Sequence, residues 1–284
     1  MPDLALTLSE VLAEGRARLD AAGIPEAARE ALRLWSDLAD QEPAQALLDR
    51  ARPVDPETAA RFMGGVERRA GGEPLAYVTG WTGFRRLELR IDRRALIPRP
   101  ETEGLVDLVL ERVPAGRVAD VGTGNGCVAL SLATEGRYQL VLGMDRSEAA
   151  LALAQENRHL TRAPVALARG DFLEGLAAGS LDAVVSNPPY ISEGEFGHLD
   201  PSVTRWEPRE ALVSGADGLD ATVRLLDESR RVVRSGGWLA LEVDAGRATA
   251  AAALARGLGW EAVEVRVDLF GRERYLLARR SDRP

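Results

Sequence analysis

The chain has 284 residues, of which 45% are hydrophobic and 28% charged, and its formal net charge is −8. This length suits one large α/β domain or a catalytic domain with a smaller companion. The acidic balance disfavours non-specific binding to duplex nucleic acid, which needs a basic surface to neutralise phosphates. The single cysteine, Cys127, excludes an intrachain disulfide, and one cysteine with two histidines disfavours a zinc site, so we expect no metal.

The chain lacks the sequence features of a membrane or secreted protein. It has no run of about 18 apolar residues, so we expect no membrane span. The first residues, MPDLALTLSEVLAEG, carry acids at Asp3 and Glu10 and lack the basic start of a signal peptide. We therefore expect a cytoplasmic protein.

Residues 1–73 are expected to form a small helical domain. The segments LSEVLAEGRARL, EAAREALRLWSDLAD and DPETAARFMGGVERRA place apolar side chains at helical spacing. Ser9 followed by acids indicates a helix start, and Asp55 before Pro56 is typical of an N-cap and a first helical position. We predict a partner-binding domain; the pattern leaves a purely structural cap open as the alternative.

Residues 74–97 differ in character from the helical region. In GFRRLELRID, the side chains of Phe84, Leu87, Leu89 and Ile91 are partly in step with strand alternation. We predict a β-hairpin linker between two domains. Its arginines are available for RNA contact, although a run of this kind more often forms a solvated surface.

Residues 98–284 alternate between predicted strands and helices. RVADVG, QLVLGMD, VALARGD, LDAVVSN and GGWLALEVD have the composition of buried strands. This order predicts an α/β domain with a doubly wound, mostly parallel sheet. The final segment, AVEVRVDLFGRERYLLARR, predicts two strands around Gly271, which would make one edge of the sheet antiparallel.

A glycine-rich turn joins one of these strands to a helix. Its glycines allow positive φ and a close approach of ligand to backbone. The spacing G-x-G-x-G differs from the dinucleotide fingerprint, and the turn lacks the lysine of a P-loop. These features favour a nucleoside without a pyrophosphate, such as S-adenosylmethionine (AdoMet). The predicted cofactor-binding residues of the turn are Gly122, Thr123, Gly124, Asn125 and Gly126.

Three further side chains are candidates for the nucleoside. Asp145 ends the next strand, where an acid can accept hydrogen bonds from both ribose hydroxyls, with a helix N-cap as its alternative role. Asp171 can accept the adenine amine and Phe172 can cover the ring, although core packing is an equal alternative for Phe172. Cys127 is interpreted as a small buried filler rather than a nucleophile.

The segment VVSNPPYIS ends an apolar strand in Asn187, Pro188, Pro189 and Tyr190. Proline has no N–H, so the ladder stops there, and strand ends of this kind line the ligand crevice of open parallel sheets. An amide nitrogen is a poor nucleophile because its lone pair is delocalised. The Asn187 side-chain oxygen and the Pro188 carbonyl can accept hydrogen bonds from its N–H groups, while Tyr190 stacks on the planar group and orients it toward the methyl donor. We predict Asn187, Pro188 and Tyr190 as catalytic residues of methyl transfer to a planar nitrogen.

The chain resembles a known family in several longer stretches. N-P-P-Y after the glycine turn resembles the amino-methyltransferases, and EPLAYVTGWTGF, LIPRPETEGLVD, the segment from NPPYISEGE to ALVSGADGLD, and DLFGRER resemble the PrmC/HemK family. Its members methylate the glutamine N5 in the Gly-Gly-Gln motif of class I peptide chain release factors. The similarity runs from about residue 73 to the C-terminus, and the N-terminal helices agree more loosely.

The resemblance implies a Rossmann-like AdoMet-dependent methyltransferase fold and a site for the substrate glutamine. AdoMet would lie against the glycine turn, Asp145, Phe172 and Asn187. The segment from Ile191 to Asp220 lacks periodicity and is predicted to cover the substrate. In LALEVDAGRA, Glu242 and Gly246 stand at an altered spacing from the family pattern, so no role is assigned to them. The predicted substrate-binding residues are Asn187, Pro188, Pro189, Tyr190, Arg99 and Glu101.

Two other functions are compatible with parts of this pattern. A nucleic-acid adenine N6-methyltransferase can use the same turn, but it must flip its base into the pocket and requires a basic groove. A non-catalytic nucleoside-binding protein has no need of an acceptor clamp such as Asn-Pro-Pro-Tyr. We therefore expect class I release factors as partners and no stable binding to nucleic acid.

Overall fold

The computed structural model describes residues 6–281. The chain divides into two compact units. The smaller consists of the residues up to Trp81 together with Pro201–Trp206, and the larger of Thr82–Asp200 and the residues from Glu207 onward. The larger unit carries the glycine turn, Asp145 and Asn187.

The smaller unit is helical, as predicted for this part of the chain. Leu19, Leu34 and Phe62 are fully buried in its hydrophobic core, and Trp35 packs edge-on against Phe62 with 5.6 Å between ring centroids. The helix α5 packs against α2 and α4, so the structural division follows α5 rather than residue 73. The helices of this unit are α1 (Leu8–Ala21), α2 (Ala27–Ala39), α3 (Pro43–Leu48), α4 (Pro56–Ala70), α5 (Leu75–Thr79) and α10 (Pro201–Thr204).

The helix starts confirm one sequence prediction and correct another. Asp55 caps α4 by accepting hydrogen bonds from the N–H groups of Glu57 and Thr58, with Pro56 in the first turn, as predicted. The prediction for Ser9 is wrong, because the N-cap of α1 is Thr7. The Thr7 hydroxyl and the Glu10 carboxylate form a reciprocal capping box, which satisfies two backbone N–H groups that the first turn leaves free.

Strands β1 (Trp81–Phe84) and β2 (Leu87–Arg90) pair with each other and confirm the predicted hairpin. Phe84, Leu89 and Ile91 are buried, which matches the predicted alternation. Arg85 lies at the tip with a positive φ, and its guanidinium pairs with Glu135 at 2.7 Å. That arginine therefore stabilises the hairpin instead of forming an open basic surface.

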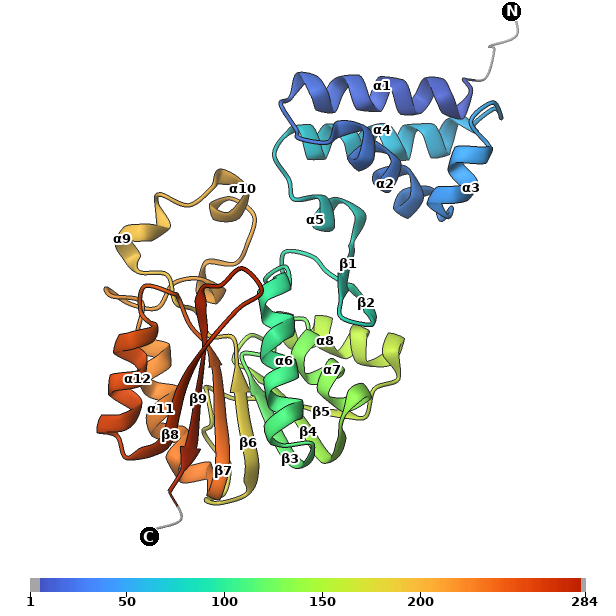
Figure 1. Ribbon diagram of the computed structural model, residues 1–284. Coiled ribbons are helices and arrows are strands. Elements are labelled where there is room, and N and C mark those ends of the chain that lie inside the picture. Colours follow the sequence, from blue (N-terminus) through green and yellow to red (C-terminus); the bar gives the residue numbers. More distant parts are fainter. Residues whose placement is uncertain (1–5, 282–284) are drawn as a thin grey trace, which may run out of the picture. The chain divides into compact units, whose positions relative to one another are not determined.

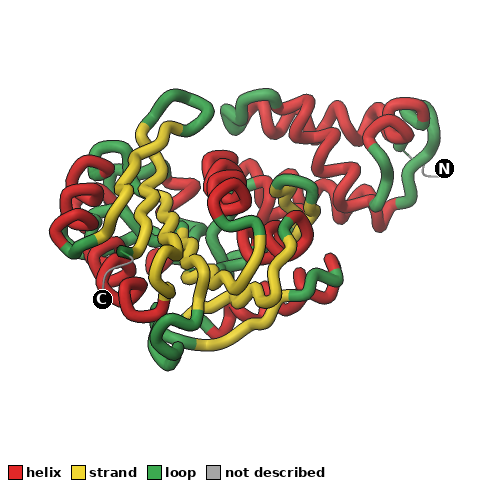
Figure 2. Tube along the Cα trace, turned by 60° about the horizontal axis from the view of Figure 1, so that its bottom comes forward, coloured by secondary structure: helices red, strands yellow, loops and turns green. Residues whose placement is uncertain are grey.

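A seven-stranded sheet forms the centre of the larger unit over the described residues (Figures 1 and 2). Its spatial order is β5-β4-β3-β6-β7-β9-β8. The first five strands run parallel, whereas β9 pairs antiparallel with both β7 and β8. The predicted parallel sheet with an antiparallel C-terminal edge is confirmed. The strands are β3 (Ala115–Val121), β4 (Arg137–Asp145), β5 (Val165–Arg169), β6 (Leu181–Ser186), β7 (Val233–Glu242), β8 (Trp260–Val267) and β9 (Glu273–Arg280).

Helices cover both faces of this sheet (Figure 1). The apolar residues of α6 (Pro100–Arg112) and α7 (Cys127–Glu135) form one core cluster with the strands. Those of α11 (Asp220–Val232), a helix not among the sequence predictions, and α12 (Ala248–Gly257) form the other. The remaining elements are α8 (Glu148–Thr161), which packs against β4 and β5, α9 (Glu193–Phe196) and the 3-10 turn η1 (Arg209–Ala211).

The topology brings the two predicted motifs together. The chain proceeds from β3 outward to β4 and β5, then returns to β6 on the other side of β3. The strand order therefore reverses between β3 and β6, and a crevice opens at the carboxyl ends of strands at such a switch point. The glycine turn follows β3 and Asn187 follows β6, so the fold places both at this crevice.

Candidate functional site

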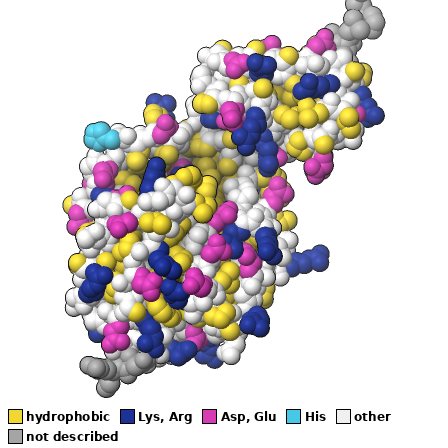
Figure 3. All heavy atoms as spheres, in the orientation of Figure 1, with side chains coloured by type: hydrophobic (Ala, Val, Ile, Leu, Met, Phe, Trp, Pro, Cys, Tyr) yellow, Lys and Arg dark blue, Asp and Glu magenta, His cyan; other side chains and the backbone are white. Residues whose placement is uncertain are grey.

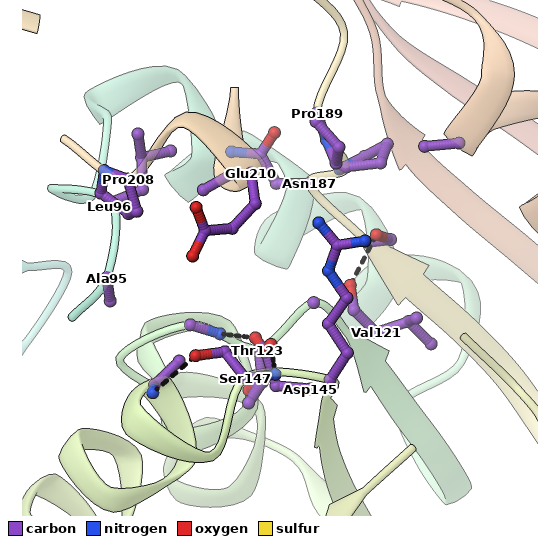
Figure 4. A pocket seen from close by; sticks show the side chains of 18 of the residues that line it. Ala95, Leu96, Val121, Thr123, Asp145, Ser147, Asn187, Pro189, Pro208 and Glu210 are labelled. Atoms are coloured by element: carbon purple, nitrogen blue, oxygen red, sulfur yellow. Dashed lines mark hydrogen bonds between the residues drawn. The ribbon is translucent and has the colours of Figure 1, made fainter. Parts of the chain in front are cut away.

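A cavity of about 390 Å³ lies at the carboxyl ends of the parallel strands (Figure 4). This volume is within the range of small-molecule sites. Most of its walls come from the turns after β3, β4, β5 and β6, from residues 94–98 and from residues 208–221, and Thr102 and Arg224 also line it. The predicted site residues that line it are Gly122, Thr123, Gly124, Asn125, Asp145, Asp171, Phe172, Asn187, Pro188 and Pro189.

The glycine turn has a left-handed backbone and is held by backbone hydrogen bonds to β4. Gly122 and Gly124 have φ of 71° and 56°, in the left-handed region that favours glycine. The N–H groups of Gly122 and Thr123 both donate to the Met144 carbonyl, at 2.8 and 2.9 Å. Gly126 is the N-cap of α7 and is not part of the described cavity lining, so its predicted contact with the cofactor remains a prediction.

Asp120, which the sequence predictions did not include, stabilises this turn through hydrogen bonds. Its side chain is 1% exposed and accepts hydrogen bonds from the Thr123 hydroxyl at 2.6 Å and the Ala129 N–H at 3.1 Å. Burial raises the pKa of Asp120 to about 7, although the two hydrogen bonds act in the opposite direction. An acid in the buried second half of a strand, two positions before the first glycine of the turn, is the signal that could have identified it.

Asp145 lies at the end of β4 and faces the glycine turn. One carboxylate oxygen accepts the Gly124 N–H at 2.9 Å, and the other accepts the Ser147 N–H at 2.9 Å. The N-cap of α8 is Ser147, whose hydroxyl accepts the Ala150 N–H, so the N-cap alternative for Asp145 is wrong. Figure 4 shows Asp145, Thr123 and Ser147 together on one side of the cavity.

Asp171 and Phe172 follow β5 and share one arginine. The guanidinium of Arg224 lies 4.3 Å from the Phe172 ring centroid and donates a 2.5 Å hydrogen bond to Asp171. Phe172 also packs against the apolar cluster of α11 and α12. The same residue thus lines the cavity and contacts the core, and its predicted cover of the adenine ring remains a prediction.

Asn187 occupies the end of β6 with its amide held in place. Its Nδ2 donates to the Thr102 hydroxyl at 3.0 Å, and that hydroxyl donates to the Glu242 carboxylate at 2.7 Å. Pro188 and Pro189 line the cavity beside it. Tyr190 is not among the described lining residues; its hydroxyl lies 3.4 Å from Glu242, and burial raises its pKa. The predicted stacking of Tyr190 on the acceptor remains a prediction.

The predicted substrate residues Arg99 and Glu101 also lie outside the described cavity lining. Arg99 pairs with the buried carboxylate of Glu207 at 2.6 Å, and that carboxylate also accepts the Ile97 N–H. The backbone carbonyl of Glu101 accepts the Tyr275 hydroxyl at 2.5 Å. Both residues hold the segment that leads into α6, and their contact with a substrate remains a prediction.

Comparison with known proteins follows the same division of the chain. The family model for the PrmC N-terminal domain matches residues 10–80, and that for the methyltransferase small domain matches residues 101–199. The release factor glutamine methyltransferase of Deinococcus radiodurans is 40% identical over 279 residues, which cover 97% of this chain and 99% of the relative. The same enzyme of Moorella thermoacetica is 40% identical over 98% of this chain and 100% of its own length.

The chain belongs to the release factor glutamine methyltransferase family. A solved methyltransferase from Pyrococcus furiosus superposes with a TM-score of 0.54 at 17% identity, over 80% of this chain and 100% of that chain. This likeness confirms the predicted methyltransferase fold. The resemblance to the PrmC/HemK family is likewise confirmed by the full-length relatives.

In this family member the segment predicted to cover the substrate folds back on itself. Ile191 and Val213 form a parallel bridge, and the Glu193 N–H donates to the Gly215 carbonyl. Arg247 joins both halves, because it pairs with Glu195 at 2.6 Å and donates to the Asp217 carbonyl at 2.5 Å. Pro208, Ser214 and several neighbours line the cavity, so the later half of this segment forms part of the wall.

Glu210 is a second residue absent from the sequence predictions. Its exposed carboxylate extends into the cavity near Asn187 (Figure 4). None of the residues that the structure describes forms an ion pair with it. It stands in an irregular segment, where no periodicity distinguishes a lining residue from a solvated one.

Cys127 and Glu242 show how burial controls side-chain charge near the site. Cys127 is buried, as predicted, and burial raises the pKa of its thiol far above its ordinary value. Burial also raises the pKa of Glu242 from 4.5 to about 7, against the hydrogen bond from Thr102 and the charge of Arg274. Gly246 lies in the turn after β7, where its N–H donates to Asp244.

Glu242→Gln is expected to become more stable relative to the wild type as pH rises. The pKa of Glu242 is higher in the folded than in the unfolded state, so the folded state binds the proton more tightly. The resulting contribution to wild-type stability is fully present below about pH 4.5 and is lost as the pH rises through about 7. We expect the free energy of unfolding of the variant minus that of the wild type to rise by about 2–3 kcal/mol between pH 5 and pH 8. Urea titrations at both pH values measure it. A constant difference would contradict the raised pKa.

The surface and the described helices bear on the remaining predictions. On the face of the larger unit shown in Figure 3, arginine and acidic side chains are interspersed rather than gathered into a basic stripe. Within residues 6–281, no group of three or more His, Cys, Asp or Glu side chains is placed to hold a metal ion. No helix in that part of the chain combines the length and apolar character that a membrane span requires.

Proposed function

We propose that this protein transfers the methyl group of AdoMet to the side-chain amide nitrogen of the glutamine in the Gly-Gly-Gln motif of class I release factors. Membership of the release factor glutamine methyltransferase family supports the substrate. The observation that carries the chemistry is the Asn187 amide, fixed at the end of β6 on the wall of the cavity. A release factor substrate also supports action in the cytoplasm.

The cavity residues fit AdoMet as the methyl donor. AdoMet supplies an electrophilic methyl group on a sulfonium sulfur. The left-handed glycine turn leaves open space at Gly122, where no heavy atom lies within 4 Å of the position of a Cβ, so a ligand can approach the backbone. Asp145 would hold the ribose, and Asp171 and Phe172 would hold the base. The carboxylates of Asp145 and Glu210 add negative charge to a cavity that would receive a cation.

The acceptor amide is activated by hydrogen bonds from its own N–H groups. The Asn187 Oδ1 atom and the Pro188 carbonyl accept these bonds and draw electron density onto nitrogen. The bonds strengthen as the nitrogen becomes pyramidal, so they belong mainly to the transition state. The two prolines fix φ in the turn, so both hydrogen-bond acceptors are already in position and need not reorganise during the reaction. The nitrogen proton is lost to solvent or a nearby acceptor once the methyl group is attached.

Methylation of a purified release factor tests the proposal directly. The protein is incubated with AdoMet and a class I release factor, and the Gly-Gly-Gln peptide is examined by mass spectrometry for one added methyl group on glutamine. A release factor with that glutamine replaced by alanine is the matched control. DNA and RNA are offered in parallel, and methylated adenine without methylated glutamine would refute the protein substrate.

Asp145→Ala is expected to weaken AdoMet binding by about 1.5–3 kcal/mol, or roughly 10- to 150-fold, because a charge-assisted hydrogen bond to the ribose is lost. Asp145→Asn keeps an oxygen acceptor for the Gly124 N–H and should lose less. Isothermal titration calorimetry measures both. Unchanged affinity in the alanine variant would restrict Asp145 to supporting the glycine turn.

A further inference from the structure

A chain of three buried or half-buried polar groups leads from the cavity wall, which Asn187 and Thr102 line, to Glu242 beyond it. Glu242 ends β7 and is 1% exposed, and Thr102, in the first turn of α6, is 2% exposed. Asn187 Nδ2 donates to Thr102 Oγ1, and Thr102 donates to Glu242 Oε2. The three residues come from separate elements, 85 and 140 positions apart along the chain in the two bonds. Only Asn187 has a function in the reaction so far described.

The donor and acceptor inventory gives this chain a direction. An ionised carboxylate can only accept hydrogen bonds, so the single O–H group of Thr102 must donate its hydrogen bond to Glu242. The Thr102 oxygen is then left with lone pairs alone, and it must face an N–H group of Asn187 rather than its carbonyl oxygen. The amide plane of Asn187 therefore points Oδ1 away from Thr102. The orientation of an Asn amide is assigned from its hydrogen-bond partners, and here Thr102 is the partner that sets it.

We propose that Thr102 and Glu242 are positioning residues that hold the Asn187 amide with its oxygen toward the acceptor nitrogen. This inference rests on the proposed function, because it concerns the same acceptor amide. With the oxygen presented, the acceptor N–H groups find a hydrogen-bond acceptor. With the amide rotated, Nδ2 would face them, and two donors would oppose each other.

The proton on Glu242 selects between these two arrangements. When Glu242 is protonated, its acid hydrogen can be donated to Thr102. The Thr102 hydroxyl is then free to donate to Asn187 Oδ1, and the amide rotates to satisfy it. The proton remains on Glu242 throughout, and no covalent bond changes. Activity should therefore require the ionised form of Glu242.

Several groups surround Glu242 and bear on its ionisation. Burial and the charge of Glu101 on α6 favour the neutral acid, whereas Thr102, Tyr190 and Arg274 on β9 favour the carboxylate. Burial raises the pKa of Tyr275 to about 12 and those of Tyr190 and Cys127 as well, so all three stay neutral near pH 7. Burial is the largest influence and brings the pKa of Glu242 to about 7. The change between the protonated and ionised forms of Glu242 thus lies in a pH range in which the enzyme can be assayed.

Steady-state kinetics of Thr102→Val, Thr102→Ser and Glu242→Gln test the proposal, with the wild type and an intact class I release factor as reference. Valine keeps the shape of threonine and removes the hydroxyl, so we expect kcat to fall about 10- to 100-fold while the KM for AdoMet changes less than about threefold. Serine keeps the hydroxyl and should restore kcat to within about threefold of the wild type. If the wild type methylates no release factor, the proposed function is refuted, rather than the positioning of Asn187 by Thr102 and Glu242.

The pH profile separates positioning from a structural effect. Wild-type kcat should fall about tenfold per pH unit below about pH 7. In Thr102→Val that acid limb should flatten, because the protonation of Glu242 no longer reaches Asn187. In Glu242→Gln, whose amide can donate to or accept from Thr102, kcat should be lowered and constant between pH 6 and 8. Wild-type kcat in Thr102→Val, or an unchanged acid limb in both variants, would overturn the proposal and assign the limb to another group, such as Asp120.

Discussion

Replacement of Asn187 by alanine is expected to lower kcat by about 10²–10⁴, the effect of removing one preorganised electrostatic partner of a transition state. The variant loses the acceptor oxygen, while Pro188 and Pro189 still shape the turn. Affinity for AdoMet should change less than about tenfold, because the amide faces the acceptor site. Single-turnover methylation of a release factor measures the first quantity, and calorimetry with AdoMet measures the second.

Asn187→Asp is the matched control for this experiment. In its protonated form the new carboxylic acid can donate to Thr102 and still present an oxygen to the acceptor, so it should retain more activity than the alanine variant. A near-normal kcat with only a raised KM in Asn187→Ala would mean that Asn187 contributes equally to substrate and transition state. The activation argument would then be wrong, although the methyltransferase function would stand.

Deletion of residues 1–80 is expected to lower kcat/KM for an intact release factor by at least about 10²-fold. The smaller unit has its own hydrophobic core, made of residues 8–78, and all residues that line the cavity lie beyond residue 93. The AdoMet dissociation constant should therefore change less than about threefold. If the helical unit recognises the partner, as we propose, its loss removes binding energy supplied by surfaces remote from the glutamine.

A short peptide containing Gly-Gly-Gln is the control substrate for the deletion. It is too small to contact a separate recognition domain, so full-length and truncated enzymes should methylate it at similar rates. AdoMet binding by the truncated chain shows that its catalytic unit has folded. Equal activity of both enzymes on the intact release factor would make the helical unit a structural cap.

Many elements near the site were predictable because their signals are local. Proline and glycine limit the backbone within a few residues, so the turn at Gly122–Gly126 and the strand end at Asn187 stand out in any context. Away from the site, alternation and helical spacing likewise identified the hairpin of residues 81–90 and the helices of the smaller unit. The helix start at Thr7 was misplaced by two residues, since Ser9 and Thr7 have similar capping chemistry and only the capping box with Glu10 selects between them.

The side chains that support the site were not predictable in the same way. Glu207, which binds Arg99, and Glu210, which enters the cavity, lie in an irregular segment whose path depends on a bridge between Ile191 and Val213. Arg224, which covers Phe172, is one of several arginines on α11. Nothing within a few residues of Glu207 or Arg224 indicates the contact with Arg99 or Phe172, because those residues come from distant parts of the chain.

The sequence by itself determined the alternating fold, the glycine turn and the strand end at Asn-Pro-Pro-Tyr, and it singled out Asp145 and Asn187 as the residues of the proposed site, because each depends on residue types at short spacing. Only the tertiary structure decided that Asn187, Thr102 and Glu242 form one hydrogen-bonded chain and that Tyr190 lies against Glu242. The sheet order places the ends of β6 and β7 side by side next to the start of α6. Hydrogen bonds act over about 3 Å, so contacts between residues 52 or more positions apart exist only once the packed sheet has brought these ends together.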